Sequence, residues 1–135
     1  MRSCVSLVPM LTAFFVIAGW NIHAAAPEPA DLSGKWHGEW VSCKTGHHGK
    51  LNARFCKISD TCYRVRFTGT FFGAVPFAFT VKLSATPQED GTVLLTGDPR
   101  LPLFGTFHFS AVATDHDFIA SYSARNDEGR FTLSR

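Results

Sequence analysis

Residues 34–40, Gly-Lys-Trp-His-Gly-Glu-Trp, constrain the fold more than any other stretch of the chain. Their alternation places Trp36, Gly38 and Trp40 on one face of an extended strand and polar residues on the other. Two indole rings on one face bury a large apolar area, so a sheet must curl around them. The glycine between them indicates a bend or the close approach of another group. These seven residues predict the entry strand of a small β domain.

The chain after residue 33 keeps the same two-residue period, without the 3.6-residue period of an amphipathic helix. Glycine, aspartate, asparagine and proline mark the connections between eight expected strands. The first six are expected at 34–43, 50–58, 62–70, 75–85, 92–97 and 103–113, and the last two contain residues 118–122 and 131–135.

Short connections make successive strands antiparallel neighbours, and a meander of eight closes into a barrel without free edges. We therefore predict an all-β, eight-stranded antiparallel up-and-down barrel, with an open sandwich as the alternative. An eight-stranded barrel has room for one small ligand or for its own side chains, so the inward rings decide whether a pocket exists. Twelve rings have inward parity: Trp36, Trp40, Phe55, Tyr63, Phe67, Phe77, Phe79, Phe107, Phe109, Phe118, Tyr122 and Phe131.

The first 26 residues of this 135-residue chain have the features of a secretory signal peptide. Arg2 is followed by an apolar run at 7–18 and by small residues at 24–26. The run is shorter than the roughly 20 residues of a membrane anchor and contains Pro9. We therefore expect a signal peptide at 1–26, a lead-in at 27–33, a barrel domain at 34–135, and a secreted or periplasmic protein.

The charge balance argues against two classes of partner. Without Arg2, 12 Lys and Arg stand beside 11 Asp and Glu. A net charge near +1 offers no field for nucleic acid and no basic stripe for a membrane surface. We expect neither nucleic-acid binding nor stable membrane insertion.

Three separated sequence marks should meet at one end of such a barrel. The first strand begins, the sixth connection turns and the eighth strand finishes at that end, which we call the base. This order resembles the lipocalin pattern of the calycin superfamily, in which a G-x-W, a T-D turn and a late arginine close the base. The matching residues are Gly34, Trp36, Thr114, Asp115 and Arg135. A guanidinium that stacks on an indole and donates to carbonyls can close an apolar barrel end.

The chain departs from that pattern in two ways. It is shorter than most lipocalins, and His116 stands where tyrosine is usual in the T-D turn. These departures indicate the smaller avidin-sized or bacterial barrels, and the chain is also similar to uncharacterised exported bacterial proteins. The resemblance implies a carrier of a small, mainly apolar ligand.

The odd-numbered connections should gather at the opposite end, which we call the mouth. Trp40 and Phe67 would form the upper wall of a pocket there, with Phe71 and Phe72 at its rim. Cationic groups are available to meet a polar or anionic end of the ligand: Arg100, Arg125, His47 and His48. The alternative is a secreted protein-interaction or inhibitor module whose rings fill the barrel.

Cysteines and histidines suggest one disulfide and no firm metal site. Cys56 and Cys62 flank the second turn on outward positions, which predicts a disulfide in an exported protein. Cys43 would stay unpaired. Together with His47 and His48, Cys43 could supply three ligands for zinc or copper. The alternative is that the three residues form an exposed turn without a metal. No fourth ligand is placed by the sequence, so no metal or cofactor is predicted.

No catalytic constellation stands out. Asp115, His116 and Asp117 lie in a turn, where aspartate is common for conformational reasons. His108 has outward parity, so it would not face a haem inside the barrel. The sequence favours a binding protein over an enzyme.

Overall fold

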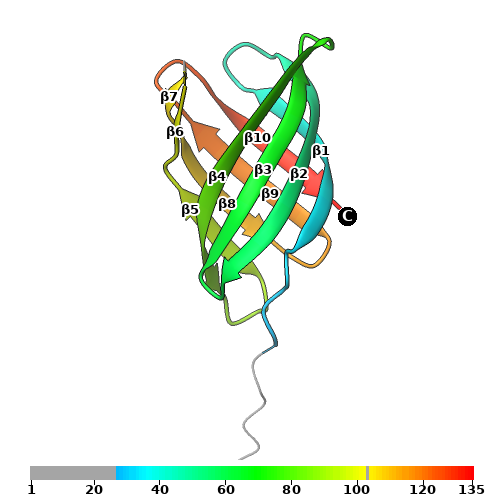
Figure 1. Cartoon of the computed structure of the whole chain (residues 1–135), viewed down its shortest axis with the longest axis vertical. Coiled ribbons are helices and arrows are strands. Elements are labelled where there is room, and N and C mark those ends of the chain that lie inside the picture. Colours follow the sequence, from blue (N-terminus) through cyan, green and yellow to red (C-terminus); the bar gives the residue numbers. More distant parts are fainter. Residues whose placement is uncertain (1–26, 103) are drawn as a thin grey trace, which may run out of the picture.

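The computed structural model describes residues 27–102 and 104–135, which form a closed barrel (Figure 1). The predicted signal peptide lies outside these residues. Every neighbouring pair in the barrel is antiparallel, and the first strand pairs with the last to close it. The predicted eight-stranded up-and-down barrel is confirmed, and it is consistent with a calycin-like fold. Its strands are β1 Gly34–Ser42, β2 His48–Ser59, β3 Cys62–Phe71, β4 Val75–Pro87, β5 Val93–Gly97, β8 His108–Ala113, β9 Asp117–Ser123 and β10 Glu128–Ser134.

One predicted strand is wrong in its first part. The sequence predicted a strand over 103–113, whereas the barrel strand β8 begins at His108. The preceding chain forms a separate hairpin of β6 (Arg100–Leu101) and β7 (Gly105–Thr106). Gly105 has a φ of +79°, in the left-handed region that glycine favours, so the chain turns there instead of staying extended.

The β6–β7 hairpin leaves part of the barrel wall incomplete at the mouth. β5 pairs with β4 only between Ser84 and Pro87. The first part of β4, from Val75 onward, therefore has β3 on one side and no β5 partner on the other. The hairpin stands at the mouth end of the barrel in Figure 1, and its Leu101 lines the same cavity as Phe77 and Phe79 of β4.

The two-residue alternation of the sequence is observed throughout the interior. All twelve rings expected inside are there: nine are buried, and Phe77, Phe79 and Phe107 are partly buried against the core. Near the base the rings pack closely, with the Trp36 centroid 5.7 Å from Phe55 and 6.4 Å from Phe118. Such aromatic pairs add about 0.5–1.5 kcal/mol each to the stability that burial provides.

Gly38 shows why the glycine between the two tryptophans is needed. A Cβ atom at this position would lie 1.8 Å from the carbonyl oxygen of Thr132 on β10. Backbone atoms cannot yield to that contact, so only glycine lets β10 approach β1 where the barrel closes. The close approach expected from the sequence is confirmed.

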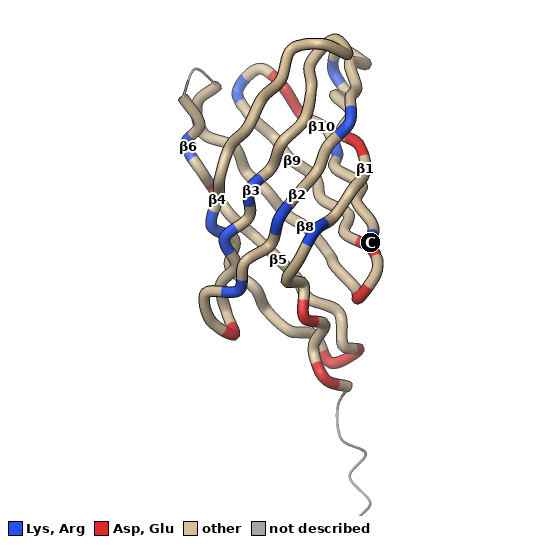
Figure 2. Tube along the Cα trace, turned by 45° about the vertical axis from the view of Figure 1, so that its right-hand side comes forward, with Lys and Arg blue, Asp and Glu red and all other residues tan. Residues whose placement is uncertain are grey.

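Charged side chains are unevenly distributed over the outer surface. Lys35, Arg54 and Arg66 stand opposite one another in register across β1, β2 and β3. Figure 2 shows Lys and Arg on this wall, whereas many of the Asp and Glu residues colour the loops at the base. Directly opposed like charges are mildly destabilising in a sheet. A net charge near zero thus conceals a basic wall and an acidic base.

Within the described ranges, no helix is long and apolar enough to cross a membrane.

Candidate functional site

The base is closed by an arginine lying on a tryptophan. The Arg135 guanidinium carbon is 4.5 Å from the centroid of the Trp36 ring. Its nitrogens donate to three backbone carbonyls, those of Asp115 at 2.7 Å, Ser33 at 2.8 Å and Asp31 at 2.5 Å. A cation is therefore held over the apolar barrel end with its donors satisfied.

The other marks of the base lie at the same end. Thr114 Oγ1 accepts the N–H groups of His116 and Asp117, at 3.2 and 3.1 Å, and so holds the turn that presents the Asp115 carbonyl. A Cβ atom on Gly34 would lie 3.9 Å from an Arg135 nitrogen. The structure thus brings Gly34, Trp36, Thr114, Asp115 and Arg135 together.

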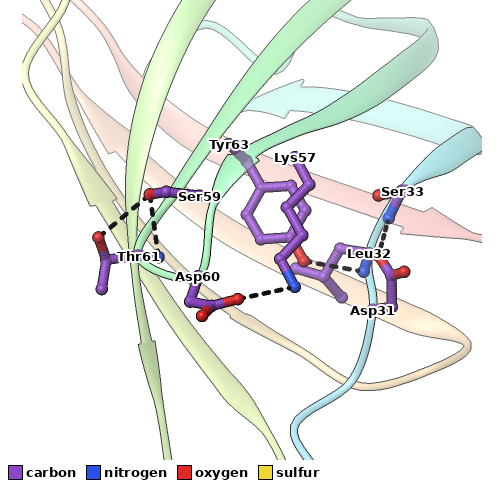
Figure 3. A network of polar contacts seen from close by, with 8 residues as sticks. All are labelled: Asp31, Leu32, Ser33, Lys57, Ser59, Asp60, Thr61 and Tyr63. Carbon is purple, nitrogen blue, oxygen red and sulfur yellow. Dashed lines mark hydrogen bonds and ion pairs between the residues drawn. The ribbon is translucent and has the colours of Figure 1, made fainter.

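The lead-in also belongs to the base, which the sequence did not predict. Leu32 is fully buried; its carbonyl accepts the Trp36 indole N–H at 2.9 Å, and its N–H donates to the Tyr63 hydroxyl at 3.2 Å (Figure 3). The Ser33 N–H donates to the Asp31 carboxylate at 3.0 Å, and this bond is the main reason why the pKa of Asp31 is lowered. The signal that could have found this plug is Leu32, an apolar residue between polar neighbours. The base is therefore sealed and offers no ligand site.

The mouth holds a cavity of about 340 Å³, which we call the mouth cavity. The Trp40 and Phe71 centroids are 5.4 Å apart and those of Phe71 and Phe77 are 4.4 Å apart, so the rings form a continuous wall. The Trp40 indole N–H already donates to the Thr70 carbonyl at 3.2 Å. The aromatic lining of the mouth cavity comes from β1, β3, β4, β9, β10 and the β6–β7 hairpin with the residue that follows it: Trp40, Phe71, Phe77, Phe79, Phe104, Phe107, Tyr122 and Phe131.

The structure brings two of the six predicted ligand residues into this cavity. Trp40 and Phe71 line it. Phe67 lies deeper, buried against Phe131 at 5.3 Å between ring centroids. Phe72 is 74% exposed and packs on the outside against His47. The two arginines border other hollows on the surface. Arg100 lines a hollow at the β6–β7 hairpin, and Arg125 lines a hollow that also includes His108.

A polar cluster in the cavity wall was missed by the sequence analysis. Asp127 lines the cavity, and its carboxylate accepts the Ser42 hydroxyl at 2.6 Å, the Tyr122 hydroxyl at 3.1 Å and the Glu128 N–H at 2.9 Å. Burial, and secondarily the Asp127 carboxylate, raises the pKa of the Tyr122 phenol. The available signal was Ser42, a polar residue that continues the inward parity of Trp36 and Trp40.

A larger hollow of about 1130 Å³ lies outside the barrel, along β1. Its lining residues are mainly glycines and charged, imidazole or hydroxyl residues, and His37 there shares a 2.8 Å hydrogen bond with Asn52. Small apolar ligands favour concave sites with a hydrophobic lining. The mouth cavity is therefore the better candidate.

The predicted Cys56–Cys62 disulfide is not formed in the structure, where Cys43, Cys56 and Cys62 are free thiols. Cys56 stands opposite Arg64, and Cys62 stands opposite Ser59 after a register shift. The two cysteines are thus diagonal neighbours, which lie about 7–8 Å apart, whereas a disulfide joins Cα atoms about 4.4–6.8 Å apart. Among the described residues, no group of three or more His, Cys, Asp or Glu is placed to hold a metal ion.

No protein-family model and no curated protein matches the chain.

Proposed function

We propose that this protein is an exported, lipocalin-like binding protein that holds a small, mainly apolar ligand in the mouth cavity. The observation that carries the proposal is a ring-lined cavity of about 340 Å³ above a packed and sealed barrel. Ligand pockets usually measure about 300–1,000 Å³ and are mostly apolar with a few placed polar groups. The mouth cavity has this composition and is at the small end of that range.

The wall beside β4 supports an entrance for the ligand. The first part of β4 has no β5 partner, and Phe77 and Phe79 project from it into the cavity lining. On the other side, Leu101 and Phe104 of the β6–β7 hairpin region line the same cavity. Among the described residues, β5 forms no ladder hydrogen bonds with this part of β4, so entry here does not require breaking β4–β5 pairing.

One structural feature and one sequence feature support the wider assignment. The contact of Arg135 with Trp36, near the Thr114–Asp115 turn, matches the closure expected of a lipocalin-like base. The composition of residues 1–26 supports export, since it has the order of charged, apolar and small residues found in signal peptides.

A second candidate function, a protein-interaction or inhibitor module, is favoured by Phe72. This residue is 74% exposed at the tip of the β3–β4 turn and has a φ of +51°. A bulky side chain in the left-handed region is rare, and such strain is concentrated at functional sites. An exposed aromatic on a rigid turn is also a common anchor at protein interfaces.

Titration with a fluorescent fatty-acid or retinoid-like probe tests the carrier function. We expect the probe to quench Trp40 and the quenching to fall in Trp40→Phe. Ala124 lines the cavity, so Ala124→Phe should weaken binding about tenfold, or about 1.4 kcal/mol. Ala74→Phe in the exposed β3–β4 turn is the matched control and should bind like the wild type. Absence of probe binding to the folded wild type would leave the interaction module as the better assignment.

A further inference from the structure

Resting on the proposed ligand site, we infer that the mouth cavity selects an amphiphilic amine, with an apolar group among the rings and an ammonium group against the Asp127 carboxylate. The mouth cavity brings together a carboxylate with a free acceptor position and several aromatic rings. The polar end of the ligand is thereby assigned the opposite charge from the one that the sequence alone suggested.

The hydrogen bonds of Asp127 leave one position for a ligand. Its Oδ1 atom accepts two donors, the Ser42 hydroxyl and the Glu128 N–H. Its Oδ2 atom accepts one, the Tyr122 hydroxyl. Each carboxylate oxygen can accept about two hydrogen bonds, so Oδ2 retains one free lone pair. The three protein donors also fix the carboxylate in place, which reduces the entropy lost when a ligand binds.

The charge of Asp127 is not matched by a nearby cation. Among the described residues, no Lys, Arg or His nitrogen lies within 4.0 Å of this carboxylate, since the ion pairs found are Lys57–Asp60 and His108–Asp98. Arg100 and Arg125 border other hollows. A ligand carboxylate in the cavity would therefore meet a like charge, whereas an ammonium group would meet an opposite one.

The rings add a second attraction for a cation. Tyr122, which bonds Asp127, lies 5.7 Å from Phe107 and 5.2 Å from Phe131 between ring centroids. Trp40 and Phe71 complete the wall. The faces of aromatic rings attract ammonium groups, by about 0.5–2 kcal/mol each according to solvent access. A carboxylate beside aromatic faces suits an ammonium group better than an uncharged hydroxyl.

A head-group series on one apolar chain tests this inference without altering the protein. Octylammonium, octyltrimethylammonium, 1-octanol and octanoate would be titrated into the wild type by calorimetry, at low salt. We expect both ammonium compounds to bind at least fivefold more tightly than octanol, and octanoate to bind most weakly. Octanoate binding as tightly as the amines would overturn the inference.

Two carboxamide variants locate the effect. Asp127→Asn keeps an acceptor oxygen for the Ser42 hydroxyl and places an amide N–H against the Tyr122 hydroxyl oxygen, but it removes the charge, so ammonium affinity should fall to the octanol level. Glu128→Gln removes the adjacent carboxylate, which does not line the cavity, and should change affinity less than twofold. If octanol and octylammonium bind equally in all three proteins, the ammonium inference fails and the carrier function stands. If no compound of the series and no apolar probe binds, the carrier function itself fails.

Discussion

The two tryptophans of β1 lie four residues apart on the same inward face, yet their surroundings are opposite. Trp36, at the base, has no exposed surface, lies under Arg135 and donates to the Leu32 carbonyl. Trp40, at the mouth, is 6% exposed, donates to the Thr70 carbonyl and lines a cavity. Both indole N–H groups are satisfied, so the difference lies in what packs against the rings.

This difference separates a stabilising end from a binding end. At the base, the lead-in and the final residue add a plug that the eight strands alone do not supply. At the mouth, the corresponding space is flanked by the β6–β7 hairpin and by part of a strand without a β5 partner. A ring that is packed on all sides makes all its contacts in the folded protein, and these contacts stabilise the fold. A ring beside a cavity has a face without packing partners, which a ligand can contact.

The largest expected effect follows from truncating each tryptophan. Trp36→Ala should lower the free energy of unfolding by about 3–5 kcal/mol, because it leaves a cavity in a packed core. Trp40→Ala should cost roughly half as much, because the cavity beside it already lacks packing partners. Guanidinium denaturation of both variants measures the difference. Equal losses would contradict the distinction between the two ends.

Removing the cation from the base has the next largest effect. Arg135→Ala loses three hydrogen bonds to carbonyls and the contact with the Trp36 ring. It should lower the free energy of unfolding by about 1–3 kcal/mol. Arg130→Ala, on the exposed face of β10, is the control and should change it by no more than about 0.5 kcal/mol. A similar unfolding midpoint for both variants would remove Arg135 from the closure of the base.

The mouth should set the alkaline limit of stability. The pKa of Tyr122 is raised in the folded protein. Its contribution to the free energy of unfolding is therefore complete below the pKa of the unfolded state, about 10, and is lost as the pH rises toward the pKa of the folded state. Between pH 9.5 and 11.5 we expect the free energy of unfolding to fall by about 1–2 kcal/mol, allowing for partial solvent screening.

Tyr122→Phe identifies the source of this loss, since it removes the titrating group and should flatten the alkaline decline. An alkaline decline that is unchanged in Tyr122→Phe would mean that the mouth is not responsible.

The base should lose stability in the opposite direction, as the pH falls. The pKa of Asp31 is lowered, chiefly by the Ser33 N–H, so its contribution is present above the unfolded pKa and is lost as the pH falls through the folded one.

The smallest expected effect concerns the turn at the rim of the mouth. Phe72 and Gly73 have φ values of +51° and +74°, as in the type I′ turns that favour Asn-Gly. Phe72→Asn should therefore raise the free energy of unfolding by about 0.5–1 kcal/mol. Gly73→Ala should lower it by a similar amount, because the added Cβ has open space but the backbone is strained. Thermal unfolding distinguishes the two, and a loss of stability in Phe72→Asn would show that the aromatic ring stabilises the turn.

The sequence was sufficient to predict the barrel and its base because both depend on local patterns. Two-residue alternation decides which side chains point inward, and the up-and-down order decides which ends meet. The positions of Trp36 and Arg135 follow from these two rules alone. Gly38 was informative for the same reason, since its missing side chain marks where the wall closes.

The mouth could not be predicted in the same way. Its shape depends on the β6–β7 hairpin, whose turn at Gly105 interrupts a stretch that alternates like a strand. Asp127 stands in a turn, where aspartate is common whether or not it faces a cavity. Cys56 pairs with Arg64, so Cys62 is its diagonal neighbour, and outward parity alone does not decide that register. Turn geometry and small register shifts are set by tertiary contacts that alternation does not encode.

The pairing of β1 with β10 also has a consequence for the order of folding. The hydrogen bond from Arg135 to the Ser33 carbonyl joins residues 102 positions apart in the chain. Contacts of such long range form late, because they require ordering of most of the intervening chain, and they slow folding. During synthesis β1 can therefore pair with β2 early, but it pairs with β10 only after that strand has been made. A chain that has not yet reached Glu128 presents two open strand edges, at which nascent molecules can associate.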